Sequence, residues 1–382
     1  MKQMPQLDSL RFFAVLGVMV AHNWDSRLLG DVDWAGNGVR LFFVLSGFLI
    51  TGILLDCRRL ADDSRQSPMY FIRQFYARRS LRIFPIYYIL IAVLVVLGVQ
   101  PADDIWPWMV TFTTNIYITI HNAWIGKMGH LWSLAVEEQF YLLWPWIVLF
   151  ASRKWLLRTL LLIIPLSSVY RFYAYRHFEF NMDTMDFKAA TFTVAHFDSL
   201  GIGALLAILW HSDVPQATLQ RYLTTIVLPV AGMLYTLCLV LYHYRVHPGI
   251  FFTVGDLFVA VMCAALVSRA GRGFAGVAGM VLECSVLRYL GKISYGLYVY
   301  HAFMPLLLIP IFEMVGIPLP VPGAANFVFS TMLTLGVASL SWHLIELPIN
   351  SLKRFFPYDT ADALCAAPSR SKSLAIRKTS GD

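Results

Sequence analysis

Long apolar runs recur along this chain, and they constrain its fold more than any other feature. A helix of roughly 20 apolar residues spans the hydrocarbon core of a bilayer. We predict ten such segments, at 7–24, 36–56, 83–100, 131–151, 156–175, 189–210, 222–243, 250–268, 289–312 and 325–346. A shorter apolar piece at 106–120 is either an eleventh span or a re-entrant or interfacial helix. The expected fold is an all-α, polytopic membrane bundle of about ten transmembrane helices with an extra short non-spanning helix.

The composition excludes a soluble globular protein. Hydrophobic residues make up 58% of the chain and charged residues only 14%, whereas about a quarter of the residues of a typical soluble domain are charged. The net charge of +7 does not indicate nucleic-acid binding, because basic residues of membrane proteins gather in cytoplasmic loops. Cysteine and histidine spacings typical of metal sites are absent from the sequence, and we predict no metal.

The distribution of basic residues indicates the orientation. With 106–120 kept as a non-spanning helix, 23 of the 30 Lys and Arg residues fall on one side of the membrane. The positive-inside rule then places both termini in the cytoplasm. A full span at 106–120 would move the basic link SRKWLLR to the other side. We expect residues 1–352 to form the membrane domain, and the polar, basic and aperiodic residues 353–382 to form a disordered cytoplasmic tail.

The first apolar run carries Arg11 and His22, eleven positions apart. On an α-helix this spacing is about 20° from three full turns, with a rise of about 16 Å, so the two side chains lie on one stripe. Asp8 joins the same face and is placed to hold the guanidinium. Charged residues within a span are costly and usually face a cavity. The alternative is that Arg11 anchors the topology and His22 lies in the interface.

A second basic cluster precedes the third apolar run. In FYARRSLRIFPIYY, we expect Arg78, Arg79 and Arg82 to lie where a basic loop enters the span, with Arg79 and Arg82 on one face. Such a cluster is either a topological signal or a dock for a phosphate-bearing donor, because arginine presents a planar fork to phosphate oxygens.

Further polar residues occur in the later spans. Glu137 and Glu138 are adjacent in HLWSLAVEEQFYLLWP and point about 100° apart on a helix, so at most one is expected to face a given cavity. Asp198 and His301 are candidates for substrate binding. His343 and Glu346 are expected on one face, as a structural pair or as the lip of a donor site.

Seven stretches, in order, resemble the acyltransferase-3 family of bacterial membrane O-acyltransferases. They are LDSLRFFAVLGVMVAHNW, FFVLSGFLITG, YARRSLRIFPIYY, HLWSLAVEEQFYLLWP, FDSLGIGALLA, LGKISYGLYVYHAFM and IELP. The first contains the Arg-x10-His pattern of the family, and the third contains its Arg-x-x-Arg pattern. The family often has arginine where this chain has His196, which puts the role of that position in doubt.

The resemblance implies an integral enzyme of the bacterial inner membrane. Such enzymes move an acyl group, usually acetyl, from cytoplasmic acyl-CoA to a hydroxyl of a glycan or similar molecule, often at the outer face. Carried over residue by residue, the Arg-x10-His pair becomes Arg11 and His22, and the Arg-x-x-Arg pair becomes Arg79 and Arg82. The family's acid falls on Glu137 or Glu138.

The residue pattern and the family resemblance together suggest one mechanism. The phosphates of the acyl donor would dock on Arg79 and Arg82, with neighbouring Arg78 also counted among the donor-binding residues and Arg11 lining the entry. His22 would act as general base on the acceptor hydroxyl or as a transient acyl carrier. Glu137 or Glu138 would orient the imidazole or bind the sugar. The expected partners are acyl-CoA, a carbohydrate or glycolipid acceptor and membrane lipid.

One rival function shares most of these features. A glycan or glycolipid transporter or flippase would also have many spans and buried charges, but it would need no basic dock for acyl-CoA. The sequence leaves open the acceptor, the acyl length and the oligomeric state.

Overall fold

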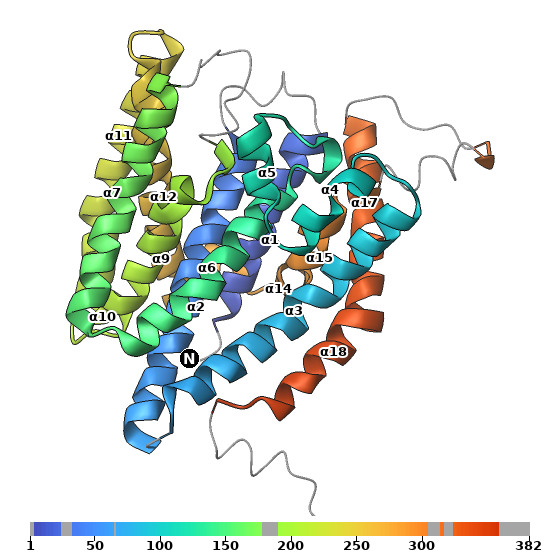
Figure 1. Cartoon of the computed structure of the whole chain (residues 1–382). Coiled ribbons are helices and arrows are strands. Elements are labelled where there is room, and N and C mark those ends of the chain that lie inside the picture. The colour runs from blue at the N-terminus through green and yellow to red at the C-terminus, as the bar shows by residue number, and fades with distance from the viewer. Residues whose placement is uncertain are drawn as a thin grey trace, which may run out of the picture.

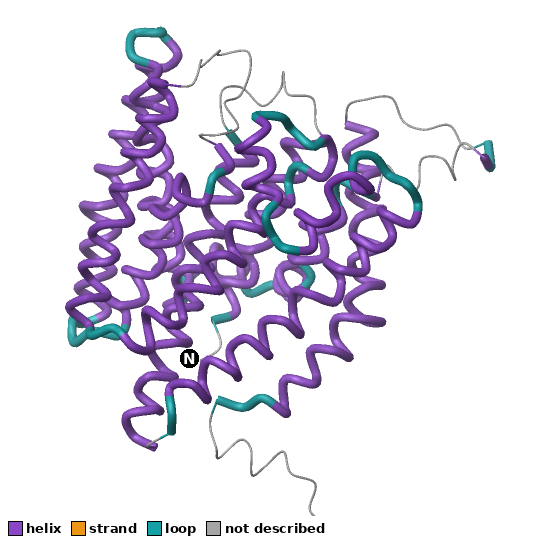
Figure 2. Tube along the Cα trace, in the orientation of Figure 1, coloured by secondary structure: helices purple, strands orange, loops and turns teal. Residues whose placement is uncertain are grey.

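The computed structural model describes residues 4–23, 33–64, 66–177, 190–304, 314–316 and 324–358. Within these ranges every regular element is a helix, and the helices pack into one bundle (Figures 1 and 2). The predicted all-α membrane bundle is therefore confirmed. Among the described residues, seven helical stretches are long and apolar enough to cross a membrane: 34–63, 68–96, 153–177, 193–210, 216–243, 249–272 and 325–355.

The first half of the chain contributes helices α1 to α7 to the bundle. Its helices are α1 (Pro5–Asn23), α2 (Trp34–Ser64), α3 (Pro68–Val96), α4 (Ala102–Val110), α5 (Thr114–His121), α6 (Leu131–Phe150) and α7 (Arg153–His177), with a 3-10 turn at Gly126–Met128. Helices α1 and α6 are 19 and 20 residues long and both pack against α2. They are not among the seven stretches, because the polar residues that they direct into the bundle lower their hydropathy.

The second half completes the bundle. Its helices are α9 (Phe197–Trp210), α10 (Gln216–Tyr222), α11 (Leu228–His243), α12 (Pro248–Arg272), α13 (Gly276–Leu282), α14 (Ser285–Lys292), α15 (Ser294–Tyr300), α17 (Ala324–Ser341) and α18 (Leu347–Ser351). Shorter elements are the 3-10 turns η3 (Thr193–His196) and η6 (Leu352–Phe355) and the π turns η4 (Leu223–Val227) and η5 (Trp342–Glu346).

Two segments depart from the predicted spans. The span expected at 289–312 is not one helix, because α14 ends at Lys292 and α15 covers only Ser294–Tyr300; residues 305–312 lie outside the described residues. The segment 106–120 forms α4 and α5, separated by a turn in which Phe112 has a φ of 53°. Helices of nine and eight residues are too short to span a bilayer. The segment thus forms two short helices where we expected one, and neither of them is long enough to span a bilayer by itself.

Helix α3 begins well before the predicted start at residue 83. The side chain of Ser67 caps it by accepting a hydrogen bond from the backbone N–H of Met69 (3.2 Å), and Pro68 occupies its first turn. Serine before the first turn and proline inside it are typical of helix starts. The basic stretch that we expected to be a loop is therefore helical, and α3 carries Arg79 and Arg82 as a rigid pair.

The two ends of the bundle differ, and we name them by α1. The terminal end is the lower end in Figure 1, where α1 starts and where α18 lies; the far end is where α1 finishes at Asn23. Helices α2 and α9 pack closely between them. A Cβ atom on Gly47 would lie 2.1 Å from the carbonyl oxygen of Leu200, and one on Gly203 would lie 2.2 Å from that of Val44. Glycine at both contacts permits this close approach.

Candidate active site

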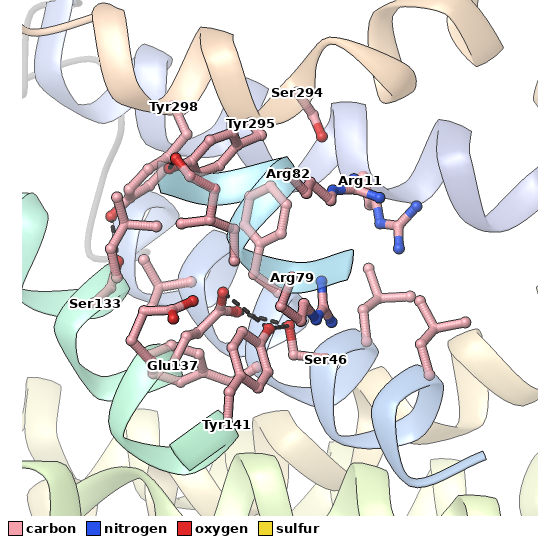
Figure 3. Close-up of a pocket in the computed structure, with 18 residues that line it drawn as sticks. Arg11, Ser46, Arg79, Arg82, Ser133, Glu137, Tyr141, Ser294, Tyr295 and Tyr298 are labelled. Carbon is pink, nitrogen blue, oxygen red and sulfur yellow. Dashed lines mark hydrogen bonds between the residues drawn. The ribbon is translucent and has the colours of Figure 1, made fainter. Parts of the chain in front are cut away.

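Five helices enclose a cavity in the interior of the bundle. Its polar lining comes from α1, α2, α3, α6 and α15, and consists of Arg11, Ser46, Arg79, Arg82, Ser133, Glu137, Glu138, Tyr141, Ser294, Tyr295 and Tyr298. Figure 3 shows Arg11 and Arg82 together on one side of the cavity and Ser133 on the opposite side. The fold thus brings together the basic and acidic residues that the sequence analysis singled out on three separate helices.

The three arginines of the cavity have few partners. Arg11 donates a hydrogen bond to Asp8 (Nη1 to Oδ1, 2.8 Å), as the sequence predicted. The guanidinium of Arg79 lies over the ring of Tyr141, 4.5 Å from its centroid. Arg82 makes no hydrogen bond or ion pair with any described residue. Unpaired guanidinium groups in a cavity favour the binding of an anion, above all one with phosphate groups.

The two glutamates of α6 both border the cavity, so the expectation that at most one would do so is wrong. The cavity follows α6 over two turns, from Ser133 to Tyr141, and residues on either side of its midline reach it. The hydroxyl of Ser46 donates to Glu137 Oε1 (2.7 Å), and the hydroxyl of Tyr141 lies 3.1 Å from Glu137 Oε2. Glu138 makes no hydrogen bond or ion pair with any described residue.

Arg78, which we predicted to bind the donor, does not line the cavity. Its Nη1 donates to the carbonyl oxygens of Lys353 and Phe356, both at 3.0 Å, and its guanidinium lies 4.9 Å from the ring centroid of Tyr358. Arg78 therefore anchors the segment 353–358 to α3. Residues 353–358 are the first residues of the predicted tail, and its remaining residues, 359–382, lie outside the described residues.

His22 and His301 meet near the far end of the bundle. The Nδ1 atom of His22 lies 2.8 Å from Nε2 of His301, which is fully buried. His22 itself is exposed, and neither glutamate of the cavity makes a hydrogen bond with it. The two residues at the ends of the Arg-x10-His pattern thus both turn towards the bundle, Arg11 into the cavity and His22 towards a buried histidine.

A hydrogen-bonded pair separates the cavity from these histidines. The hydroxyls of Ser133 and Tyr298 lie 2.5 Å apart, and the Tyr298 hydroxyl donates to the carbonyl oxygen of His130 (2.8 Å). The ring of His130 stands edge-on to that of His301, with centroids 4.8 Å apart. The polar interior therefore continues from Arg11 through the cavity to Tyr298, and then through one layer of side chains to His22.

Asp198 lies outside the cavity, in a separate ion-pair network that joins α2, α7, α9 and α12. It is fully buried, accepts from Arg171 Nη2 (2.6 Å) and also accepts from the backbone N–H of Ser199 (2.6 Å). Arg171 also faces Asp256 (3.7 Å), which pairs with Arg40. The carboxylate of Asp198, which we predicted to bind substrate, is therefore engaged by protein partners outside the cavity.

The expected pairing of His343 with Glu346 is also wrong. Both lie in η5, whose π winding closes a wider turn than an α-helix, so the i,i+3 spacing no longer places them on one face. His343 is exposed, 3.4 Å from the hydroxyl of Tyr289, whereas Glu346 is buried.

Several cavity residues escaped the sequence analysis although their motifs contain them. Tyr141 lies four residues after Glu137, and Tyr298 lies three residues before His301. Both spacings place the side chains on the same helical face. Tyrosine is common in membrane helices, so only the spacing relative to a titratable residue could have indicated them. Among the described residues, no group of three or more His, Cys, Asp or Glu side chains is arranged to hold a metal ion.

The fold and the cavity define a class before any comparison is made: a multi-pass membrane protein with an interior, arginine-lined cavity that leads towards a histidine. Comparison with known families identifies the chain further. Residues 4–343 match the acyltransferase domain that defines the acyltransferase-3 family. The match covers nearly the whole chain, and the protein therefore belongs to this family of acyltransferases, as the sequence motifs suggested.

Individual relatives are O-acetyltransferases by name. The chain is 29% identical to the peptidoglycan O-acetyltransferase OatA of Listeria monocytogenes over 91% of its own length and 56% of that protein. It is 28% identical to the putative peptidoglycan O-acetyltransferase YrhL of Bacillus subtilis, over 92% and 55%, and 24% identical to the O-acetyltransferase OatA of Staphylococcus aureus, over 91% and 57%. The chain thus spans little more than half the length of these relatives. No solved structure matches it significantly.

Proposed function

We propose that this protein is an O-acetyltransferase of the bacterial inner membrane. It takes an acetyl group from acetyl-CoA at the terminal end, which faces the cytoplasm with both termini, and transfers it to a hydroxyl of a glycan at the far end. Three relatives named as O-acetyltransferases support the reaction, and two of those names specify peptidoglycan, which favours a polysaccharide acceptor. The observation that carries the proposal is that Arg82, which has no partner among the described residues, lines one cavity together with Arg79 and Arg11.

The arginines would hold the donor. Acetyl-CoA carries phosphate groups at one end and a thioester at the other, joined by a pantetheine arm. Arg79 and Arg82 bind the phosphates, and Arg11, held by Asp8, lines the path of the arm. Glu138, whose carboxylate has no partner among the described residues, accepts hydrogen bonds from the pantetheine amides. A transporter would have no use for such a dock, which is why we favour acyl transfer.

His22 would perform the chemistry. Its Nε2 takes the proton of the acceptor hydroxyl while the hydroxyl oxygen attacks the carbonyl carbon of the thioester. The C–S bond then breaks, and the CoA thiolate leaves and takes the proton from the imidazolium. The products are an acetyl ester and the CoA thiol. The Tyr298–Ser133 hydrogen bond has to open for the thioester to reach His22, since the cavity ends at this pair.

Label transfer in reconstituted vesicles tests this function. The vesicles receive acetyl-labelled acetyl-CoA and soluble peptidoglycan fragments, and alkali-labile label on the fragments is counted. We expect transfer by the wild-type protein and a fall in kcat of about 100- to 10,000-fold for His22→Ala, the range usual for a lost general base. His177→Ala removes an exposed histidine that does not line the cavity and is the matched control. Transport of unmodified fragments without any label transfer would contradict the proposal and favour the flippase.

A further inference from the structure

We propose that His301 is a positioning residue that sets the tautomer of His22, so that the Nε2 atom of His22 is free of a proton and ready to act as a base. The inference rests on the proposed function for its catalytic meaning, but the tautomer itself follows from hydrogen-bond chemistry. It changes the role of His301, which the sequence analysis had assigned to substrate binding.

The Nδ1 atom of His301 lies 2.7 Å from the backbone carbonyl oxygen of Tyr298. A carbonyl oxygen only accepts hydrogen bonds, so His301 must carry a proton on Nδ1 and donate it. Because this carbonyl belongs to α15, three residues earlier in the same segment, the contact is local and holds the ring in one orientation.

The surroundings of His301 disfavour its charged form. Its side chain is fully buried, and no carboxylate of the described residues lies within 4 Å of its ring nitrogens. A buried cation without a counter-charge costs too much free energy to persist. His301 is therefore neutral, and with its proton on Nδ1 its Nε2 atom carries only a lone pair.

The neutral His301 determines which ring nitrogen of His22 carries the proton. The Nδ1 atom of His22 lies 2.8 Å from Nε2 of His301, and since the latter can only accept, His22 must donate from Nδ1. The ring planes differ by 5° while the centroids are 5.1 Å apart. Nitrogen therefore points at nitrogen edge to edge, and the hydrogen bond lies close to the plane of both rings. A neutral His22 with its proton on Nδ1 has an unprotonated Nε2.

Neighbouring residues hold the hydrogen-bonded pair of His22 and His301 in place. The ring of His130 packs at 68° against that of His301, with centroids 4.8 Å apart, and its own Nδ1 lies 2.9 Å from the carbonyl oxygen of Lys127. Tyr298 supplies the backbone oxygen for His301, and its hydroxyl closes the cavity through Ser133. Nε2 of His22 makes no hydrogen bond to any described residue, and His22 is exposed, so this atom is accessible to an acceptor hydroxyl.

Other catalytic histidines are arranged in a similar way: a partner at one ring nitrogen determines which nitrogen acts as the base. In this case the partner is a second, neutral histidine anchored on a backbone carbonyl. Both routes left open for His22, general base and transient acyl carrier, need an unprotonated Nε2, so the inference serves either.

A pair of substitutions at one position tests the inference. In His301→Gln the amide oxygen can still accept a hydrogen bond from Nδ1 of His22, whereas His301→Met has a similar size and no acceptor of comparable strength. We expect His301→Gln to keep kcat within a few-fold of the wild type. We expect His301→Met to lose roughly 10- to 100-fold in kcat, the scale of a misplaced catalytic group, with an unchanged KM for acetyl-CoA.

A spectroscopic readout separates positioning from packing. Nitrogen-15 NMR of protein labelled at histidine, with His22→Gln used to assign the signals, distinguishes protonated from unprotonated ring nitrogens. We expect His22 to be protonated at Nδ1 in the wild type and in His301→Gln, and to be a mixture of tautomers in His301→Met. Full activity of His301→Met, or a wild-type His22 protonated at Nε2, would overturn the inference. Full activity of His22→Ala would instead refute the catalytic role in the proposed function and leave the tautomer assignment intact.

Discussion

Two groups of charged residues inside this bundle differ in how their charges are paired. In the ion-pair network of α2, α7, α9 and α12, every arginine faces at least one carboxylate, and Arg171 and Asp198 are 3% and 0% exposed. In the cavity, Arg82 has no partner among the described residues and Glu138 has none either. A protein that only needed to join helices would pair its charges, because unpaired charges at low dielectric are costly. The group with unpaired charges is thus the better candidate for binding a charged ligand.

The strongest test of this contrast removes one member of the paired network. Arg171→Met leaves Asp198 buried without its counter-charge, and we expect it to destabilise the fold by about 3–5 kcal/mol, as broken buried ion pairs do. The measurement is the thermal unfolding midpoint in detergent. The double variant Arg171→Met/Asp198→Leu should recover much of the loss. An unchanged midpoint for the single variant would remove the structural role that we assign to the network.

The same substitution in the cavity should act on function instead. Arg82→Met removes a charge that has no partner, so we expect the thermal midpoint to stay the same or rise. The KM for acetyl-CoA should increase roughly 10- to 100-fold, since a hydrogen bond to a charged group contributes about 1.5–3 kcal/mol. Arg73→Ala, at an exposed position of the same helix, serves as control. A large loss of stability with an unchanged KM would make Arg82 structural and move the donor site elsewhere.

The smallest expected effect comes from salt. Raising the ionic strength shortens the screening length from about 10 Å at 0.1 M to about 3 Å at 1 M. The KM for acetyl-CoA should therefore rise several-fold across this range, because the arginines at the entry attract the donor through solvent. The thermal midpoint should change little, since the paired network is buried. A KM that does not respond to salt would argue against a phosphate dock.

The sequence predicted the membrane class, the positions of most helices and the charged residues of the cavity wall. It placed the start of α3 too late, although Ser67 and Pro68 carry a recognisable helix start, because the arginines that follow resemble a loop. It could not distinguish Asp198 from Glu138, since both are acids in apolar surroundings. Their difference lies in Arg171, which comes from another helix 27 residues away in the chain.

The amino-acid order alone determined which helices form and which stripe of α1 carries Arg11 and His22, because apolar length and helical periodicity are local properties of a chain. Tertiary structure decided the rest: which charges find partners, that Arg78 anchors a later segment while Arg79 faces the cavity, and that His301 meets His22 across 279 positions. Such meetings depend on how helices pack, and packing is a property of the assembled bundle that no single segment encodes.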